Sequence, residues 1–137
     1  MRSYTLHLHD SRNSLCVTEV ASFVGEDESG RFGILPGHAR MMTVLLFGLA
    51  RFRCLGEDSW QYLAMPGGVL YFADNTLHLG CRQYLLDKDY QRISRRLVEE
   101  LLAEEELLDE VRLSVKRMEE ALFKRLYEMG RRGVSWS

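Results

Sequence analysis

The side chains best suited to catalysis or metal binding in this chain are its four histidines and three cysteines. A histidine beside a cysteine can act as the base of a thiol hydrolase, so His38 is a candidate partner for Cys16, Cys54 or Cys81. The cysteines are odd in number, lie far apart and show no C-x-x-C spacing. This pattern favours buried, reduced thiols over metal ligation, and a hydrolase is the least favoured function.

His7 and His9 lie two residues apart, a spacing that places both on one face of a strand and that metal sites can use. No further ligand cluster accompanies them in the sequence, so solvent-facing strand histidines are the favoured interpretation. The chain also has no G-x-S-x-G, Walker-type or H-E-x-x-H motif. We therefore predict neither a catalytic residue nor a metal site.

Residues 30–43 place glycines, a proline and a histidine at fixed offsets. Gly30 and Gly33 can adopt backbone conformations closed to other residues, and Pro36 followed by Gly37 is a strong turn signal. A bare turn needs no histidine after it, which points to a binding role for His38.

The segment resembles the signature of the epsilon subunit of F-type ATP synthases, roughly Gly-x-Leu-Gly-Ile-x-Pro-x-His-x-Pro-Leu-x-Thr. Phe32 replaces the leucine and Arg40 the second proline, while the rest of the pattern is kept. A second match, at 65–70, is similar to the Ser-Gly-Gly-aromatic segment of that family. Together the matches cover most of residues 1–86, and the departures indicate a divergent branch, for which an alternate sodium-type ATPase is a hypothesis.

The resemblance implies a noncatalytic central-stalk subunit that needs no cofactor and couples the gamma subunit to the membrane rotor ring of c subunits. It implies a gamma interface at His38, Met41 and Met42, and a rotor-ring interface at Arg31. Arg31 is cationic where the family often has an acidic or small residue. It is therefore expected to meet a carboxylate or carbonyl of the ring, or to pair with a neighbouring acid among residues 26–28. The alternative is a solvated loop arginine without a partner.

The candidate interface residues must be positioned by short apolar runs, each of which is bounded by turn signals. Tyr4, Leu6 and Leu8 alternate with polar neighbours, and further runs follow at 15–24, 42–46, 49–55, 60–64, 69–72 and 76–79. Short strands at such spacing predict an antiparallel β-sandwich or flattened barrel. The epsilon family has such an N-terminal sandwich.

Composition bounds the possible partners. The chain has 137 residues, 46% of them hydrophobic, and a net charge of −2, which gives no reason to expect nucleic acid. No apolar run approaches the roughly 20 residues of a membrane span, so we expect no membrane insertion. The expected location is the cytoplasm, peripheral to the inner (plasma) membrane through the ATP synthase complex.

The second half changes composition and carries a helical period. Tyr90, Ile93, Leu97 and Leu101 form one apolar stripe, beginning near a cap at Asp87 or Asp89, and a second stripe spans 108–129. No helix breaker separates the stripes, so a hairpin turning near 103–107 and one continuous helix are both locally acceptable. We predict an α+β fold, with a β-sandwich domain at 1–86 and a C-terminal helical hairpin domain at 87–137.

In the epsilon family, the C-terminal helices can extend into the alpha/beta catalytic hexamer and inhibit hydrolysis, and basic residues of the second helix meet an acidic loop of the beta subunit. The resemblance implies beta-subunit contacts from the basic residues of this tail, Arg112, Lys116, Arg117, Lys124 and Arg125. The alternative to a helical tail that switches between two forms is a static hairpin. The alternative to a basic face that binds the beta subunit is a solvated face with ion pairs within the helix.

Some bacterial epsilon subunits bind ATP through Ile/Leu-Asp-x-x-Arg-Ala, which makes Asp89 and Arg92 the candidate nucleotide-binding residues. Lys88 replaces the aliphatic residue and Ile93 the alanine, and a branched side chain would crowd a base, so ATP binding is not expected. The alternative function for the whole chain is a β-sandwich adaptor that docks partners through its helical tail.

Overall fold

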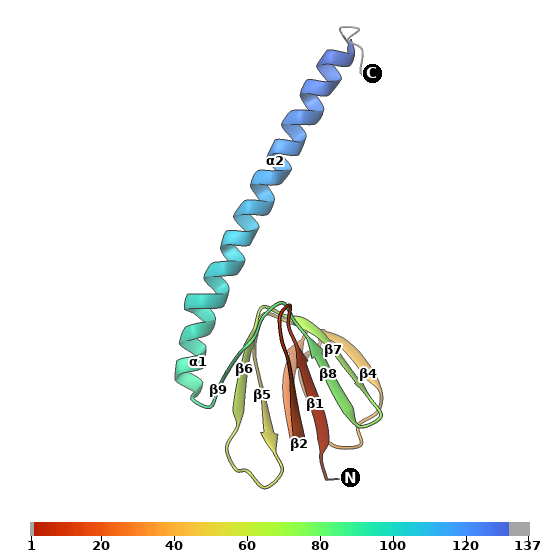
Figure 1. Cartoon of the computed structure of the whole chain (residues 1–137), viewed down its shortest axis with the longest axis vertical. Coiled ribbons are helices and arrows are strands. Elements are labelled where there is room, and N and C mark those ends of the chain that lie inside the picture. The colour runs from red at the N-terminus through yellow and green to blue at the C-terminus, as the bar shows by residue number, and fades with distance from the viewer. Residues whose placement is uncertain (1, 132–137) are drawn as a thin grey trace. The chain divides into compact units, whose positions relative to one another are not determined.

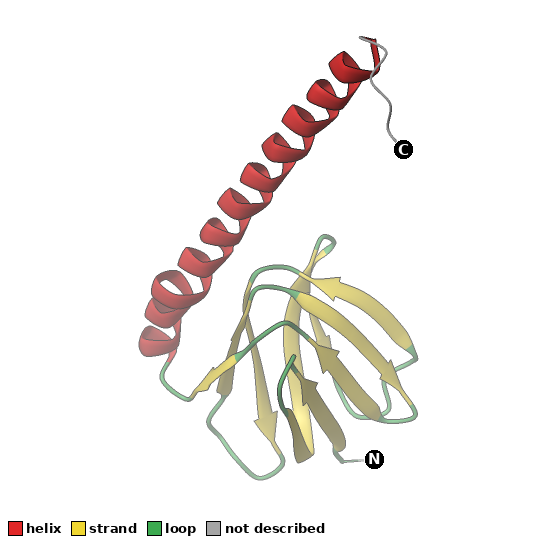
Figure 2. Ribbon diagram, turned by 45° about the horizontal axis from the view of Figure 1, so that its top comes forward, coloured by secondary structure: helices red, strands yellow, loops and turns green. Residues whose placement is uncertain are grey.

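The computed structural model describes residues 2–131, which form nine strands followed by helical segments (Figures 1 and 2). The strands are β1 (Tyr4–His9), β2 (Ser14–Asp27), β3 (Gly30–Ile34), β4 (Met41–Leu45), β5 (Gly48–Cys54), β6 (Gln61–Met65), β7 (Gly68–Ala73), β8 (Thr76–Gly80) and β9 (Leu85–Asp87). The helical segments are α1 (Tyr90–Arg96), the π-helical η1 (Leu97–Leu102) and α2 (Ala103–Arg131).

The strands form one sheet in the order β4-β7-β8-β1-β2-β5-β6-β9, with β3 paired to β2, and this sheet folds into a β-sandwich (Figure 2). The long β2 links the two layers, because its first half pairs with β1 and its second half with β5 and β3. Its register shifts between Val20 and Ser22, next to Glu19 with a φ of 59°. Such a bulge bends the strand in which it lies, here β2.

One strand pair departs from the expected antiparallel arrangement. β1 and β8 pair in parallel, with His7 opposite His78, whereas every other paired strand among the described residues is antiparallel. Parallel neighbours need no hairpin between them and come from distant parts of the chain, so turn signals could not reveal this pair. The predicted sandwich is confirmed, with this one parallel contact.

The core follows the predicted alternation. Tyr4, Leu6 and Leu8 are buried with Phe23 and Phe72 between the layers, because alternate residues of each strand face inward. The Tyr4 hydroxyl donates a hydrogen bond of 2.8 Å to the Ile34 carbonyl, and burial raises the Tyr4 pKa. A second apolar cluster joins Ile93 and Leu101 to Ala64 of β6, which fixes α1 and η1 on the sheet.

The compact units differ from the expected domain boundary at residues 86 and 87. The first unit runs to Leu102, because Ile93 and Leu101 bury against β6, and the second begins at Ala103. The turn expected near 103–107 is absent, since these residues lie within α2. The predicted hairpin is therefore wrong for this structure, and the helical alternative is observed. Residues 132–137 of the predicted tail domain lie outside the described part.

Candidate functional site

The signature segment forms a fixed turn between β3 and β4. The His38 amide donates to the Leu35 carbonyl over 3.1 Å, and the Gly37 amide donates to Asn75 Oδ1 over 2.9 Å. Gly37 has a φ of 80°, which favours glycine. Asn75 Nδ2 in turn donates to the Ser3 carbonyl over 2.8 Å. These bonds hold the turn against the loop between β7 and β8, so His38 is presented from a defined position.

His38 is exposed and stands edge-on to Phe72, with ring centroids 5.9 Å apart. Its Nδ1 lies 2.7 Å from the Ala39 carbonyl, where an N–H can donate. Among the described residues, no hydrogen bond joins the His38 ring to a cysteine, so the structure shows no thiol–imidazole pair. The hydrolase alternative gains nothing from this geometry.

The cysteines are all free, but only in part buried as expected. Cys16 is exposed, because the first half of β2 turns that side chain to the outer face of the sheet, so the expectation of a buried thiol is wrong there. Cys54 and Cys81 are half-buried, and burial raises the pKa of the Cys81 thiol to about 11. That thiol is protonated at neutral pH and is a poor nucleophile.

The outer face of β4 and β7 exposes a run of apolar side chains. Met42 is 69% exposed and Val44 63%, and on β7 Val69, which lies opposite Val44, is 52% exposed. Met41 packs against the core instead, because neighbouring residues of a strand face opposite sides. The sequence analysis assigned both Met41 and Met42 to the gamma interface, but in the structure only Met42 lies on the outer face.

The apolar run continues into a row of aromatic side chains across neighbouring strands. Met42 lies opposite Tyr71, Tyr71 opposite His78, and His78 opposite His7. The rings of His7 and His78 stack with centroids 5.0 Å apart, and His9 stacks with each of them at 6.1 Å. We call His7, His9 and His78 the histidine cluster.

Sequence reasoning found His7 and His9 but missed His78. The alternation in 76–79 already indicates that His78 faces outward. What the sequence did not reveal was the parallel pairing of β1 and β8, which brings His78 beside His7. Within residues 2–131 no group of His, Cys, Asp and Glu side chains is arranged to hold a metal ion. The stacked rings are nearly parallel, at 10–12° to one another, so they lie face to face.

Arg31 is exposed on β3, directly opposite Glu26 of β2. No ion pair joins it to Glu26, Asp27 or Glu28 in the described structure, and the Asp27 carboxylate instead accepts bonds from Ser29 and Thr43. Arg31 lines an open cavity of about 340 Å³ together with Arg51 and other residues. Its guanidinium is therefore available to an acceptor from outside the chain.

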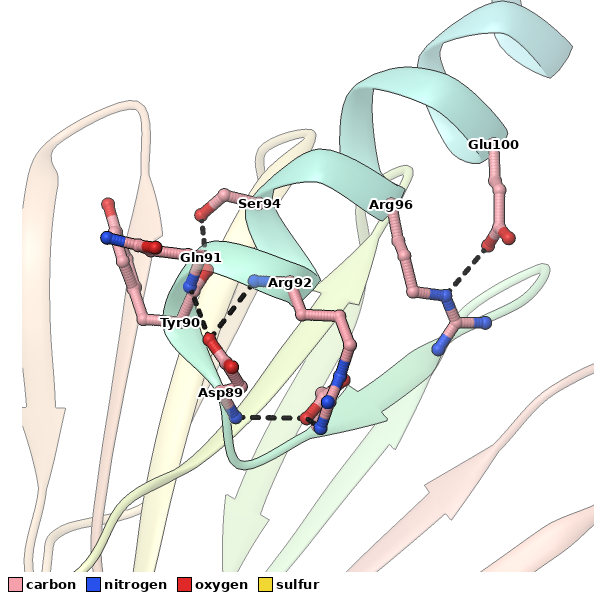
Figure 3. A network of polar contacts seen from close by, with 8 residues as sticks. Asp89, Tyr90, Gln91, Arg92, Ser94, Arg96 and Glu100 are labelled. Atoms are coloured by element: carbon pink, nitrogen blue, oxygen red, sulfur yellow. Dashed lines mark hydrogen bonds and ion pairs between the residues drawn. The ribbon is translucent and has the colours of Figure 1, made fainter.

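Asp89 and Arg92, the candidate nucleotide-binding residues, both make bonds within the chain (Figure 3). Asp89 Oδ1 accepts from the amides of Gln91 and Arg92 over 3.0 and 3.2 Å, which caps α1. The Arg92 guanidinium donates to both carboxylate oxygens of Asp87, over 2.5 and 2.6 Å, and this lowers the Asp87 pKa. Capping and ion pairing explain these residues without a nucleotide.

The basic residues proposed for the beta subunit all lie on α2. Arg112 donates to Asp109 over 3.2 Å, and the other four are Lys116, Arg117, Lys124 and Arg125, all exposed. The second apolar stripe of this helix is also largely exposed, including Val111 at 51% and Met118 at 71%. Within its own compact unit, α2 thus offers both basic and apolar side chains to a partner.

Comparison with known proteins places these features in a family. The model of the ATP synthase delta/epsilon chain β-sandwich domain matches residues 4–84. The chain is 39% identical over 79 residues to ATP synthase epsilon chain 2 of Cereibacter sphaeroides, covering 57% of this chain and 53% of that protein. It is 37% identical over 68 residues to epsilon chain 2 of Paraburkholderia xenovorans, covering 49% and 48%. The chain thus spans about half the length of these curated relatives.

Solved structures with the same fold include a chain of the Euglena gracilis mitochondrial ATP synthase assembly of OSCP, F1 and c-ring. That match has a TM-score of 0.58 and 18% identity, covering 72% of this chain and 64% of the other. A chain of the Tetrahymena thermophila central stalk and c-ring has a TM-score of 0.52 and 15% identity, covering 61% and 66%. Among the described residues, no helix combines the length and apolar character that crossing a membrane would take.

Proposed function

Because the chain belongs to the family of ATP synthase delta/epsilon β-sandwich subunits, we propose that it is a noncatalytic epsilon subunit of the central stalk of an F-type ATP synthase. In this role it couples the gamma subunit to the membrane rotor ring. The complex would hold it at the cytoplasmic side of the inner (plasma) membrane. The two bacterial relatives named epsilon chain 2 support a divergent branch of the family.

The observation that carries the gamma contact is the apolar outer face of β4 and β7. Exposed apolar side chains gathered on one face mark interaction sites more often than chance placement does. Met42, Val44 and Val69 form such a group, and β4 stands at the end of the sheet order with β7 as its neighbour. We define these three residues with Tyr71 as the docking face, and His38 on the preceding turn borders β4.

The remaining contacts are assigned to other parts of the molecule. Arg31 is proposed to meet a carboxylate or carbonyl of the rotor ring, because it has no ion-pair partner among the described residues. The basic side chains of α2 are proposed to meet the beta subunit and to restrain hydrolysis. No cofactor is proposed, since Asp89 and Arg92 already serve as helix cap and ion-pair partner.

Co-purification with a gamma subunit from the same organism tests the assignment. Met42→Glu places a charge in the docking face without changing the core, and we expect it to weaken gamma binding at least tenfold. Leu55→Glu is the matched control, because Leu55 is 42% exposed and lies outside the docking face. Wild-type chain that fails to retain gamma, or equal binding by both variants, would contradict the proposed docking.

A further inference from the structure

The histidine cluster adjoins the docking face on the same side of the sheet. Tyr71 belongs to the docking face and stacks on His78, with ring centroids 6.3 Å apart. His78 is in turn the direct neighbour of His7 in the parallel pair of β8 and β1. A partner that covers Met42 and Tyr71 therefore reaches the cluster across one strand spacing, which is about 5 Å.

The cluster is a group of bases with few neighbouring charges. His7, His9 and His78 make ring contacts, but no hydrogen bond or ion pair involves their rings within the described residues. The titratable groups facing them are Tyr71 from β7 and Cys16, which lies opposite His7 on β2. Neither of these groups is a carboxylate.

Asp10 directly follows His9 in the sequence and carries a carboxylate. Its Oδ1 accepts hydrogen bonds from the amides of Arg12 and Asn13, over 2.8 and 2.6 Å, so it closes its own turn. Protons added to the cluster are therefore not neutralised by a paired acid. Partial burial and the charges of His7 and His9 already lower the His78 pKa, in the direction that such crowding predicts.

We propose that the histidine cluster makes docking of the gamma subunit depend on protons, with the subunit held when the three imidazoles are neutral and released when they are protonated. The proposal rests on the proposed function and adds regulation to the same surface. Covering a charged imidazole with an apolar partner removes its hydration, and adding charges to stacked rings makes them repel. Acidification therefore favours the uncovered face.

The size and sign of the effect follow from proton linkage. For one histidine at the ordinary pKa of about 6.5, the requirement to be neutral in the complex weakens binding about tenfold at pH 5.5 and hardly at pH 7.5. The lowered pKa of His78 moves the contribution of that residue to lower pH. Affinity is thus complete above the pKa of the uncovered histidines and is lost as the pH falls through it.

The test measures the Kd of the full chain for purified gamma at pH 7.5 and 5.5. Wild type is expected to bind at least about tenfold more weakly at pH 5.5. The triple variant His7→Thr, His9→Thr and His78→Thr, which keeps strand-forming residues, is expected to show a Kd ratio below about threefold. Leu55→Glu, which lies outside both the docking face and the cluster, is expected to keep the wild-type ratio, and His78→Gln alone is expected to reduce it if the triple variant does not fold.

Each outcome decides a different point. A wild-type Kd that is equal at the two pH values, with binding present, would overturn proton gating and leave the docking proposal standing. A ratio that persists in the folded triple variant, or that disappears in Leu55→Glu, would also overturn it. Absence of wild-type binding at pH 7.5 would overturn the docking proposal itself, and gating with it.

Discussion

The Tyr4 side chain shows how one residue joins the two layers of the sandwich. Its ring stands edge-on to Phe72, with centroids 5.4 Å apart, and its hydroxyl bonds to the carbonyl of Ile34 on β3. Both contacts are buried, so the polar end of the side chain is satisfied within the core. The same residue therefore contributes apolar burial and a hydrogen bond between distant strands.

Tyr4→Phe is expected to lower the free energy of unfolding by about 1 kcal/mol, because the Ile34 carbonyl loses its donor in a buried site. Urea unfolding followed by circular dichroism measures the change. Tyr127→Phe on α2 is the control, since Tyr127 is 67% exposed, and it should change stability by less than about 0.5 kcal/mol. Equal effects of the two variants would show that the Tyr4 bond contributes nothing.

At the scale of elements, alternation predicted most strands because one face of each is buried. It correctly separated Leu6 from His7, but it did not separate Met41 from Met42, since both are apolar and only the pairing of β4 with β7 shows which faces inward. The parallel pair of β1 and β8 was beyond sequence reasoning because its strands are distant along the chain. The short β9 was missed for the same reason, as its partner is β6.

The helical segments were predicted less completely. The stripe through Ile93 and Leu101 was found correctly, and the structure shows what it covers, namely Ala64 of β6. The course of the chain at 103–107 was left open by local propensity, because good helix formers permit a turn only when tertiary contacts stabilise it. In the described structure these residues are helical.

Ile93→Ala is expected to cost at least about 2 kcal/mol, because Ile93 is fully buried and its removal leaves a cavity beneath α1. The loss should appear first as faster amide hydrogen exchange in α1 and η1 while the sandwich core stays protected. Val98→Ala is the matched control in the same helical stretch, with Val98 57% exposed. Uniform loss of protection in every strand would mean that α1 is part of the sandwich folding unit.

At the scale of the whole molecule, two compact units carry different proposed roles. The unit up to Leu102 holds the docking face, the histidine cluster and Arg31, while α2 holds the basic side chains. Many exposed apolar residues on α2, such as Phe123 at 71%, are what a helix with an external partner would present. Docking and inhibition should therefore be separable by truncation.

Deletion of residues 103–137 is expected to leave a folded chain that binds gamma as well as the full chain does, and to raise ATP hydrolysis by the reconstituted enzyme. A longer deletion, of 87–137, should be less stable because it uncovers Ala64. Hydrolysis assays on enzyme with confirmed subunit content make the comparison. Unchanged hydrolysis after the shorter deletion would remove the inhibitory role from α2 and leave docking untouched.

The central claim is that the outer face of β4 and β7 binds the gamma subunit. Amide hydrogen exchange of the full chain, measured with and without gamma at pH 7.5, tests it most directly, because it maps the covered strands without any substitution. We predict added protection in β4, where β7 is the hydrogen-bonded neighbour, with smaller gains in β7 and β8. Protection confined to β5 and β6, or to α2, with β4 unchanged, would contradict the claim.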